Sequence, residues 1–473
     1  MPVEPRQRSG DENRFPGTQR RGGPMSQKHQ FSRRTFLRGA GATAVLGAVG
    51  ARPGGIGGAA DLMASTSRQS FDFDEIYDRR GPDCTKWDRA IAAFGEDIEV
   101  GMGIADMDFR AAPCITEALA KRCEHENWGY LARPASYTQA IADWNHRRYG
   151  LEVDPSTIEL TTGVHPGLIA ALHAFSPPGS RVLMNTPTYN GFYSDLRFTR
   201  TIAEDSEMYV VNGRYEVDWD DFERRATRVN SFLLCNPQNP TGNCWSEEDL
   251  LRMGEICLRN RVIVLADEIH CDFVTADNKY TPFASLPDKE IVDNSLTFKA
   301  ASKTFSLAAM KAAWYFSTNR NLMARARAFT RADLSTLGME ANRAALTDGD
   351  EWLDQLLLYL DGNHDLAESY LKNVPGVNYT KAQGTYLAWL DVNGLMDKVG
   401  AREKAAEENE TSESVVTPEQ IMQRWFAENA RIYLNPGHSY GTGGSGRMRM
   451  NLATSRVLVQ KALDNLGAAV ANA

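Results

Sequence analysis

The chain has 473 residues, which is room for two domains or more, and its 42% hydrophobic and 24% charged content is ordinary for a soluble globular protein. Residues 1–60 hold ten Lys/Arg and three Asp/Glu, a net charge of +7, so the remainder carries −16 of the overall −9. An acidic body argues against nucleic acid or an anionic membrane as the main partner. Seven cysteines without a C-x-x-C pair exclude a disulfide framework and zinc-ligand spacing, so we expect free or buried thiols.

The first sixty residues have the order of an export signal. Residues 1–30 are polar and rich in Arg, Gly, Pro and Gln, which predicts disorder. The sequence SRRTFL at 32–37 precedes a weakly apolar run at 39–51, an order typical of twin-arginine signals. That run is too short for a stable membrane span, which needs about 20 apolar residues. We expect the twin-arginine machinery to export the protein to the periplasm or the extracellular side, with cleavage between Ala44 and Ala64. The alternative is a disordered basic tail with a chance arginine pair on a cytoplasmic protein.

From about residue 70 the chain alternates helical and strand-like runs. An amphipathic helix is predicted at 137–149, with Ser136 as a possible N-cap. Strands alternating with helices predict an α/β fold with a mostly parallel sheet. The expected buried strands lie at 158–161, 181–184, 231–235, 262–266 and 295–298, and helices between them at 167–175, 219–225 and 246–259.

The C-terminal third has a different pattern. A long helix is predicted at 350–371, followed by strands at 377–380 and 385–390. The polar segment 392–416, rich in Glu, Ala and Lys, is expected to be an exposed helix or insertion.

Four motifs carry the chemistry. The first three directly follow predicted parallel strands, at the strand ends where open α/β sheets bind ligands. The motifs are NPQNPTG at 236–242, DEIH at 267–270, SKTF at 302–305, and RMNLA at 449–453 near the C-terminus.

Together these motifs predict a site for pyridoxal 5'-phosphate (PLP). PLP needs a lysine amine for its Schiff base and a carboxylate beside the pyridine nitrogen. We expect Lys303 to carry the cofactor as an internal Schiff base, and Asp267 to keep the ring nitrogen protonated, so that the ring can take up electrons from a Cα carbanion. Arg449 can bind the substrate carboxylate bidentately.

The other candidate residues would hold the rest of the cofactor. Asn239 and His270 could bond the ring 3'-oxygen, and Tyr189 could stack on the ring. Backbone N–H groups of Thr162-Gly163-Val164, at a predicted helix N-terminus, suit the phosphate, with Ser302 and Lys311 adding a hydroxyl and a charge. Taken singly, each residue has a plain alternative, such as a loop, a helix cap, core packing or a surface ion pair; the ordered set is what indicates PLP.

In this order the motifs resemble the class I/II aminotransferase superfamily, with the type I PLP fold. More narrowly, the chain resembles the MalY/PatB group of C–S β-lyases, which are cystathionine β-lyase-like. The resemblance covers about residues 70–470. The narrower match includes FDEI at 73–76, DRRG at 78–81, KWD at 86–88, ADMDF at 105–109, WGY at 128–130 and TYLAWLD at 385–391.

The resemblance implies a large PLP-binding domain at 116–345 with a mostly parallel central sheet. It also implies a smaller α+β domain built from 70–115 and 346–473, after the tail and signal at 1–60. It implies a homodimer with the sites at the interface, in which Tyr130 reaches the neighbouring subunit's phosphate and takes part in that site.

The chain departs from the group's pattern mainly on the substrate side. The departures are Gly103 where a bulky residue is usual, Asn190-Gly191 after Tyr189 in place of Pro-Pro, Ser306-Leu307-Ala308-Ala309 after the lysine motif, Lys311 in place of a phosphate-binding Arg, and an inserted acidic stretch near 401–414.

The leading hypothesis is α,β-elimination from a cysteine S-conjugate, which releases a thiol, pyruvate and ammonia. Arg449 would hold the carboxylate and Lys303 would act as general base on Cα–H. The alternative is an aminotransferase that uses the same lysine to return the proton to the cofactor. A third possibility is a PLP-binding regulator on this scaffold, against which the retained Lys303, Asp267 and Arg449 argue.

Overall fold

The computed structural model describes residues 69–81 and 83–473, which belong to one compact unit, Arg68–Ala473. The export signal expected at 32–37 lies outside the described residues. Within the two described ranges, no helix has both the length and the apolar character needed to cross a membrane.

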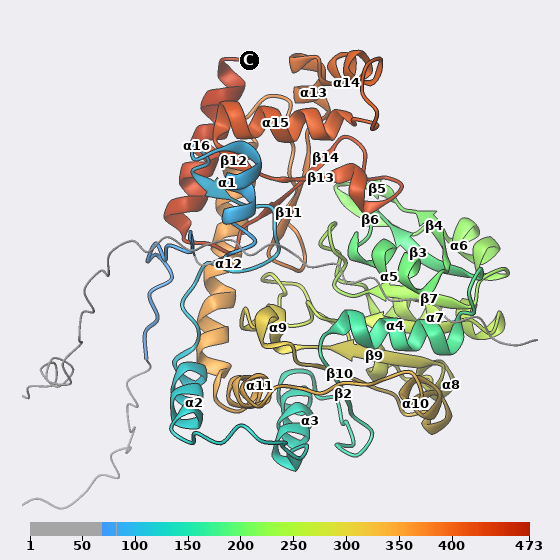
Figure 1. Ribbon diagram of the computed structural model, residues 1–473. Coiled ribbons are helices and arrows are strands. Elements are labelled where there is room, and N and C mark those ends of the chain that lie inside the picture. The colour runs from blue at the N-terminus through green and yellow to red at the C-terminus, as the bar shows by residue number, and fades with distance from the viewer. Residues whose placement is uncertain (1–68, 82) are drawn as a thin grey trace, which may run out of the picture. The chain divides into compact units, whose positions relative to one another are not determined.

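A seven-stranded sheet forms the centre of the structure (Figure 1). Five neighbouring strands run parallel, and the strand at one end of this group pairs with an antiparallel strand that in turn pairs with the edge strand. The mostly parallel sheet predicted from the sequence is therefore confirmed. In spatial order the strands are β2 (Glu159–Thr161), β10 (Ala313–Phe316), β9 (Ser295–Lys299), β8 (Ile263–Asp267), β7 (Ser231–Cys235), β3 (Arg181–Thr186) and β4 (Ile202–Glu207).

Helices cover both faces of this sheet. Because side chains alternate along each strand, the central strands contribute buried residues to both faces. In β7, Phe232 and Leu234 pack into the core under one set of helices, and Leu233 and Cys235 into the core on the opposite face. The first face is covered by α6 (Trp219–Ala226), α7 (Glu247–Arg259) and α8 (Lys289–Asp293), and the second by α4 (Val164–Phe175), α5 (Gly191–Thr199) and α10 (Arg320–Arg327).

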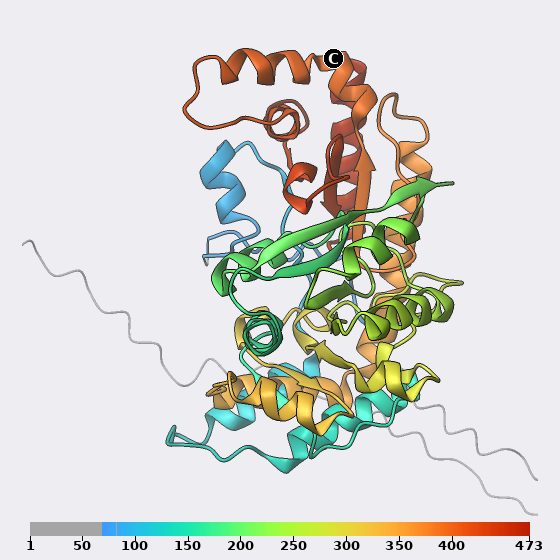
Figure 2. The same cartoon turned by 90° about the vertical axis from the view of Figure 1, so that its right-hand side faces the viewer.

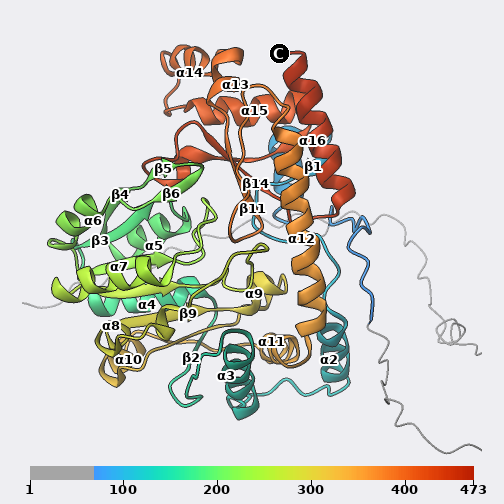
Figure 3. The same ribbon diagram turned by 180° about the vertical axis from the view of Figure 1, so that it is seen from behind.

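A second core joins segments from both ends of the described chain. Trp87 and Val100 pack with Ile432 and Leu463 in one cluster. Figure 2 shows the blue segment with α1 (Asp88–Phe94) beside the red C-terminal elements, and Figure 3 shows α12 (Asp350–Leu371) and α16 (Arg456–Ala471) side by side. This core is built from α12, α15 (Pro418–Ala430), α16, the parallel pair β1 (Val100–Gly101) and β12 (Ile432–Tyr433), and the antiparallel sheet β11 (Leu387–Asp391), β14 (Arg447–Asn451) and β13 (Asn435–Pro436). Helix α1 packs against α15 in a separate small cluster of Ala90, Ile98 and Ala427. The domain boundaries at 115/116 and 345/346 stay a prediction.

Further elements complete the described chain. These elements are α2 (Pro113–Cys123), α3 (Ala135–Tyr149), α9 (Ala301–Thr304), α11 (Thr336–Asp348), α13 (Asn393–Val399), α14 (Ala401–Asn409), the hairpin β5 (Tyr209–Val211) and β6 (Arg214–Glu216), and short 3-10 turns at Phe283–Ser285, Ala308–Met310 and Gly437–Tyr440. The polar segment expected as an exposed helix or insertion forms α13 and α14, and only Leu395, Met396, Ala401 and Ala405 of these helices are buried.

Two local predictions are wrong. Helix α3 begins at Ala135 after Pro134, whose backbone is extended, so Ser136 lies inside the first turn and is not the N-cap. The strand expected at 377–380 reduces to one isolated bridge between Asn378 and Asp391. In this segment the Tyr379 side chain is buried and contacts His364, at 2.6 Å from hydroxyl to ring nitrogen.

Candidate cofactor and substrate site

A cavity of about 440 Å³ opens at the carboxyl ends of the parallel strands. Every residue expected to bind the cofactor lines it, except Tyr130. The predicted lining residues are Thr162, Gly163, Val164, Tyr189, Asn239, Asp267, His270, Ser302, Lys303 and Lys311. They converge because β7, β8 and β9 end at the same edge of the sheet.

Lys303 lies on the four-residue helix α9, directly after β9. Its Nζ donates a hydrogen bond to the carbonyl oxygen of Ala105 at 2.6 Å. Burial lowers the pKa of the Lys303 amine to about 8, and the Arg449 cation acts in the same direction. An amine with this pKa is neutral, and so able to accept a proton, in a much larger fraction near neutral pH than an ordinary lysine.

Asp267 is the last residue of β8, and it faces the same cavity. Burial raises the pKa of its carboxyl to about 7, whereas the backbone N–H of Ile269 and the His165 imidazole act in the opposite direction. Its Oδ1 accepts from the N–H of Ile269 at 3.1 Å. A buried carboxylate of this kind gains most from a cation placed opposite it, and a protonated pyridine nitrogen is such a cation.

The phosphate end of the expected site lies at the start of α4. Gly163 is the N-cap of this helix and provides no side-chain cap bond, so the helix begins without a protein side chain on its N–H groups. Ser302 and Lys311 line the same cavity. These groups are suited to an anion.

Two buried polar atoms without a protein partner belong to His270, which lines the cavity, and to Arg449, which does not line it but binds the lining residue Asn239. Among the described residues, His270 Nδ1 and Arg449 Nε have no hydrogen-bond partner. Burial, with the Lys303 and Arg449 cations, holds the pKa of His270 well below its usual value, so this imidazole is neutral. Because unpaired buried polar atoms are costly, both atoms indicate a polar ligand.

Arg449 lies on β14, beside the cavity. One terminal nitrogen donates to Asn239 Oδ1 at 3.0 Å and the other to the Gly103 carbonyl at 2.8 Å. The Tyr440 ring lies under the guanidinium, 5.1 Å from centroid to carbon. These contacts fix the guanidinium plane and leave its Nε–H without a protein partner.

An imidazole–carboxylate pair at the cavity, whose His165 lines the wall, was not predicted from the sequence. His165 Nδ1 lies 2.6 Å from Asp195 Oδ2, and His165 Nε2 lies 3.2 Å from the Tyr189 hydroxyl. His165 directly follows the Thr162–Val164 turn, which could have drawn attention to it. Asp195, on α5, had no local signal.

Tyr130 does not reach the cavity of its own chain. It is fully exposed, and it lines a separate surface groove with Trp128 and Leu131, both about half exposed. Exposed apolar side chains gathered in this way are typical of an interaction surface.

Comparison with known proteins places the chain in a family. The model of the family described as aminotransferase class I and II matches residues 97–466. The chain belongs to this family. Cystathionine beta-lyase PatB from Bacillus subtilis (strain 168) is 35% identical over 409 residues, which cover 85% of this chain and all of PatB.

Two solved structures share the fold over 85% of this chain. A PLP-bound putative aminotransferase from Clostridium difficile 630 is 30% identical, with a TM-score of 0.77, and is covered completely. The PLP-bound C-S lyase from Staphylococcus hominis is 27% identical, with a TM-score of 0.74 over 98% of its chain. These similarities confirm the type I fold expected from the motifs.

Proposed function

We propose that this protein is a PLP-dependent C–S β-lyase that converts a cysteine S-conjugate into a thiol, pyruvate and ammonia. The observation that carries the proposal is the placement of Lys303 and Asp267 in one cavity at the strand ends. The full-length similarity to a cystathionine β-lyase supports the choice of reaction.

The residues present suit PLP. Lys303 provides the amine for covalent attachment, Asp267 the carboxylate for the ring nitrogen, and Tyr189 an aromatic face. Asn239 and His270 are available to the 3'-oxygen. The start of α4, with Ser302 and Lys311, is available to the phosphate. When bound, PLP supplies an electron sink for the charge that develops at the substrate Cα.

The chain's own groups perform the remaining tasks. Arg449 binds the substrate carboxylate through the guanidinium edge that contains the free Nε–H. Lys303, with its lowered pKa, removes the Cα proton. The contacts from Arg449 to Asn239 and Gly103 hold the guanidinium in place before the substrate arrives, which reduces the ordering that binding requires.

A substrate panel tests this reaction. Incubation of the protein with L-cystathionine or an S-alkyl cysteine is expected to release pyruvate and thiol in equal amounts without an added keto acid. The Lys303→Ala variant serves as the inactive control. Absence of both products with every substrate would refute the lyase.

Transamination is the second candidate, favoured by the similarity to the protein described as a putative aminotransferase. It predicts that amino-group loss depends on a keto acid and that a new amino acid appears in its place. The same panel, run with and without a keto acid, separates the two reactions.

We also propose that the protein is a homodimer whose sites use Tyr130 from the neighbouring subunit. The exposed groove around Trp128 and Tyr130 supports this assembly. Refolding Lys303→Ala together with Tyr130→Ala is expected to restore part of the activity, because a hybrid dimer contains one site with both native residues. Failure of the mixture to exceed the separate variants would count against a shared site.

We propose export through the twin-arginine route on the basis of residues 32–37. This route carries folded proteins, which suits an enzyme loaded with its cofactor in the cytoplasm. Replacing Arg33 and Arg34 by Lys is expected to retain the protein in the cytoplasmic fraction. Equal distribution of both forms between cell fractions would refute the signal.

A further inference from the structure

The segment 102–109, here called the strap, lies between β1 and α2 and contacts Lys303 and Arg449 through its backbone. It has no regular hydrogen-bond ladder, so its backbone groups must find other partners. Five consecutive carbonyls accept hydrogen bonds from side chains: Gly103 from Arg449, Ile104 from Asn451, Ala105 from Lys303 and Tyr386, Asp106 from Lys86 and Asn451, and Met107 from Arg79. The strap therefore contacts both the candidate carboxylate arginine and the cofactor lysine.

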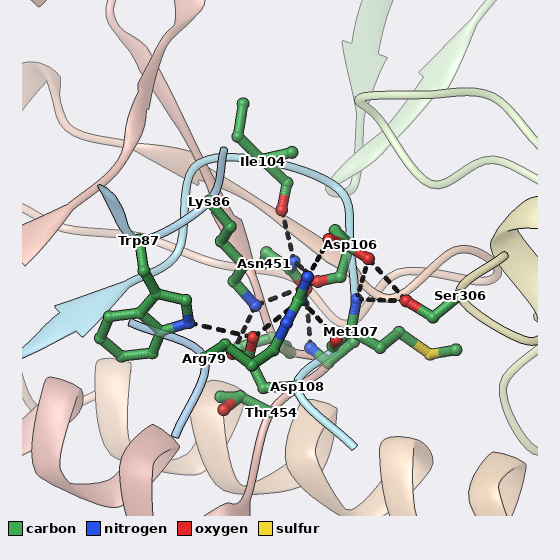
Figure 4. A network of polar contacts seen from close by, with 12 residues as sticks. Arg79, Lys86, Trp87, Ile104, Asp106, Met107, Asp108, Ser306, Asn451 and Thr454 are labelled. Atoms are coloured by element: carbon green, nitrogen blue, oxygen red, sulfur yellow. Dashed lines mark hydrogen bonds and ion pairs between the residues drawn. The ribbon is translucent and has the colours of Figure 1, made fainter. Parts of the chain in front are cut away.

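Asp106 connects the strap to the loop that follows Lys303 (Figure 4). Its Oδ1 accepts from the Ser306 hydroxyl at 2.5 Å, and its Oδ2 accepts from Arg79 at 2.7 Å. Burial acts to raise the pKa of Asp106, but the Ser306 hydroxyl and the Arg79 guanidinium outweigh it, so the net pKa is lowered and the carboxylate is ionised.

The helix that carries Lys303 depends on such contacts. A helix of four residues has no stability of its own. Two hydroxyls beside the lysine bind carboxylates from other segments: Thr304 donates to Asp272 at 2.5 Å, and Ser306 donates to Asp106 at 2.5 Å. Of the two carboxylates, Asp106 neighbours the residue whose carbonyl receives the Lys303 amine.

Ion pairs with an upstream segment fix the strap in place. Lys86, with no exposed side-chain surface, donates to Asp108 Oδ2 at 2.6 Å, and the Trp87 indole donates to Asp108 Oδ1 at 3.0 Å (Figure 4). Arg79 bridges Asp106 and Asp108, at 2.7 and 3.2 Å. Buried ion pairs contribute little net stability, but they permit few alternative arrangements.

We propose that Asp106 is a positioning residue for Lys303: with Ser306 it holds the lysine loop against the strap, so that the Ala105 carbonyl orients the amine. The inference rests on the proposed function for the identity of Lys303 as the cofactor lysine. An amine that donates one N–H to Ala105 directs its lone pair away from that carbonyl. Because Gly103 on the same strap binds Arg449, the strap sets the position of the base relative to the substrate carboxylate.

The test compares Asp106→Asn with Asp78→Asn in the full-length enzyme. Asp78 is a matched control, because it is an exposed carboxylate paired with Arg80 in the same N-terminal segment. The first readout is the pH dependence of the bound cofactor's absorbance without substrate. This absorbance reports protonation of the Lys303 nitrogen in its bond to the cofactor. Since the Asp106 charge favours the protonated form of this nitrogen, we expect the midpoint to fall by about one pH unit in Asp106→Asn and to stay unchanged in Asp78→Asn.

Kinetics separate the charge of Asp106 from its position. Asp106→Asn is expected to lower kcat by about tenfold. Asp106→Glu keeps the negative charge but moves the carboxylate by one methylene group. It is expected to restore the absorbance midpoint but not kcat. Ser306→Ala, which leaves the carboxylate and its ion pairs in place, is expected to lower kcat without moving the midpoint. It also keeps the test decisive if Asp106→Asn fails to fold.

Two outcomes would overturn the inference. One is an Asp106→Asn enzyme with wild-type midpoint and kcat; the other is a Ser306→Ala enzyme with wild-type kcat. A wild-type protein that shows no cofactor absorbance would instead refute the proposed function. In that case, mass spectrometry can follow the acetylation of Lys303 at several pH values in the Asp106→Asn and Asp78→Asn variants. Equal midpoints of this pH dependence in the two variants would overturn the inference.

Discussion

At the scale of single residues, the site places a lysine whose charged form is disfavoured near an aspartate whose charged form is disfavoured as well. Burial lowers the pKa of Lys303 to about 8 and raises the pKa of Asp267 to about 7. Both changes have the same origin, since removing water disfavours whichever form is charged. A bound cofactor would provide the polar partners that water no longer provides, so binding it would stabilise both Lys303 and Asp267.

Arg449→Lys is expected to raise KM by about 10- to 100-fold with a smaller change in kcat, because an ammonium cannot replace a bidentate guanidinium contact. Steady-state kinetics with the substrate identified by the panel measures both constants. Arg447→Lys is the matched control: it lies on the same strand and pairs with Asp391 at 3.3 Å, away from the cavity. Equal KM values in the two variants would contradict a carboxylate-binding role for Arg449.

Asp195→Asn tests the pair that the sequence did not reveal. Asp195 is 4% exposed and holds His165, which contacts the Tyr189 hydroxyl. Without its charge we expect a looser Tyr189 and a dissociation constant for PLP raised about tenfold, which corresponds to about 1.4 kcal/mol. Equilibrium titration of the cofactor-free protein measures this constant.

Asp205→Asn provides the comparison for Asp195→Asn. Asp205 accepts from the Tyr193 hydroxyl at 2.9 Å, and it does not line the cavity. A comparable rise in the dissociation constant in both variants would show that the effect is general loosening of α5 rather than support of Tyr189.

At the scale of elements, the strap depends on close packing against β12. A Cβ added to Gly103 would lie 2.4 Å from Tyr433 Cε1 and 2.7 Å from Asn435 Oδ1, closer than real contacts allow. A side chain larger than glycine would not fit here without movement of Tyr433. Gly103 is therefore matched to the Tyr433 side chain, far along the chain.

Gly103→Ala is expected to shift the strap and, through the Gly103 carbonyl, to misplace Arg449. We expect KM to rise roughly tenfold, because small displacements of positioning groups weaken catalysis strongly. The double variant Gly103→Ala with Tyr433→Ala removes the contacts with the Tyr433 ring, leaves only the close contact with Asn435 Oδ1, and should recover part of the loss. If the double variant is as impaired as the single one, the packing explanation is wrong.

At the scale of the whole molecule, buried histidines couple stability to pH. His364 is fully buried between the Tyr379 hydroxyl and the Thr385 carbonyl, and burial lowers its pKa to about 4. The folded state thus binds a proton less readily than the unfolded state, whose histidine pKa is about 6.5. The stabilisation is fully present above pH 6.5 and is lost as the pH falls towards 4, up to about 3 kcal/mol.

His364→Gln is expected to flatten this dependence. Between pH 6.5 and 4 the slope of the unfolding free energy should fall by up to about 1.4 kcal/mol per pH unit, since one fewer proton is taken up on unfolding. Urea unfolding at several pH values measures the slope. His125→Gln, at an exposed position, is the control; a slope unchanged in both variants would exclude His364 as the source.

The secondary structure around the site was largely predictable, because it depends on local patterns. Strand β7 and helix α12 have the predicted bounds, and the helix predicted at 246–259 forms as α7, where the Ser246 hydroxyl accepts from the Asp249 N–H at 3.0 Å. At 377–380 the local pattern predicted a strand, but only Asn378 pairs, in one isolated bridge with Asp391.

The sequence by itself determined the chemistry at the strand ends. Lys303, Asp267 and Asn239 each follow an apolar strand, and parallel strands of one sheet must end at a common edge, so their convergence needed no further information. Only the tertiary structure decided what surrounds them. The contacts of Ala105 with Lys303 and of Asp106 with Ser306 span about two hundred residues of chain. No local periodicity records such pairs, because they exist only once the hydrophobic cluster that contains Ala105, Met107, Ala301 and Phe305 brings the strap against the lysine loop.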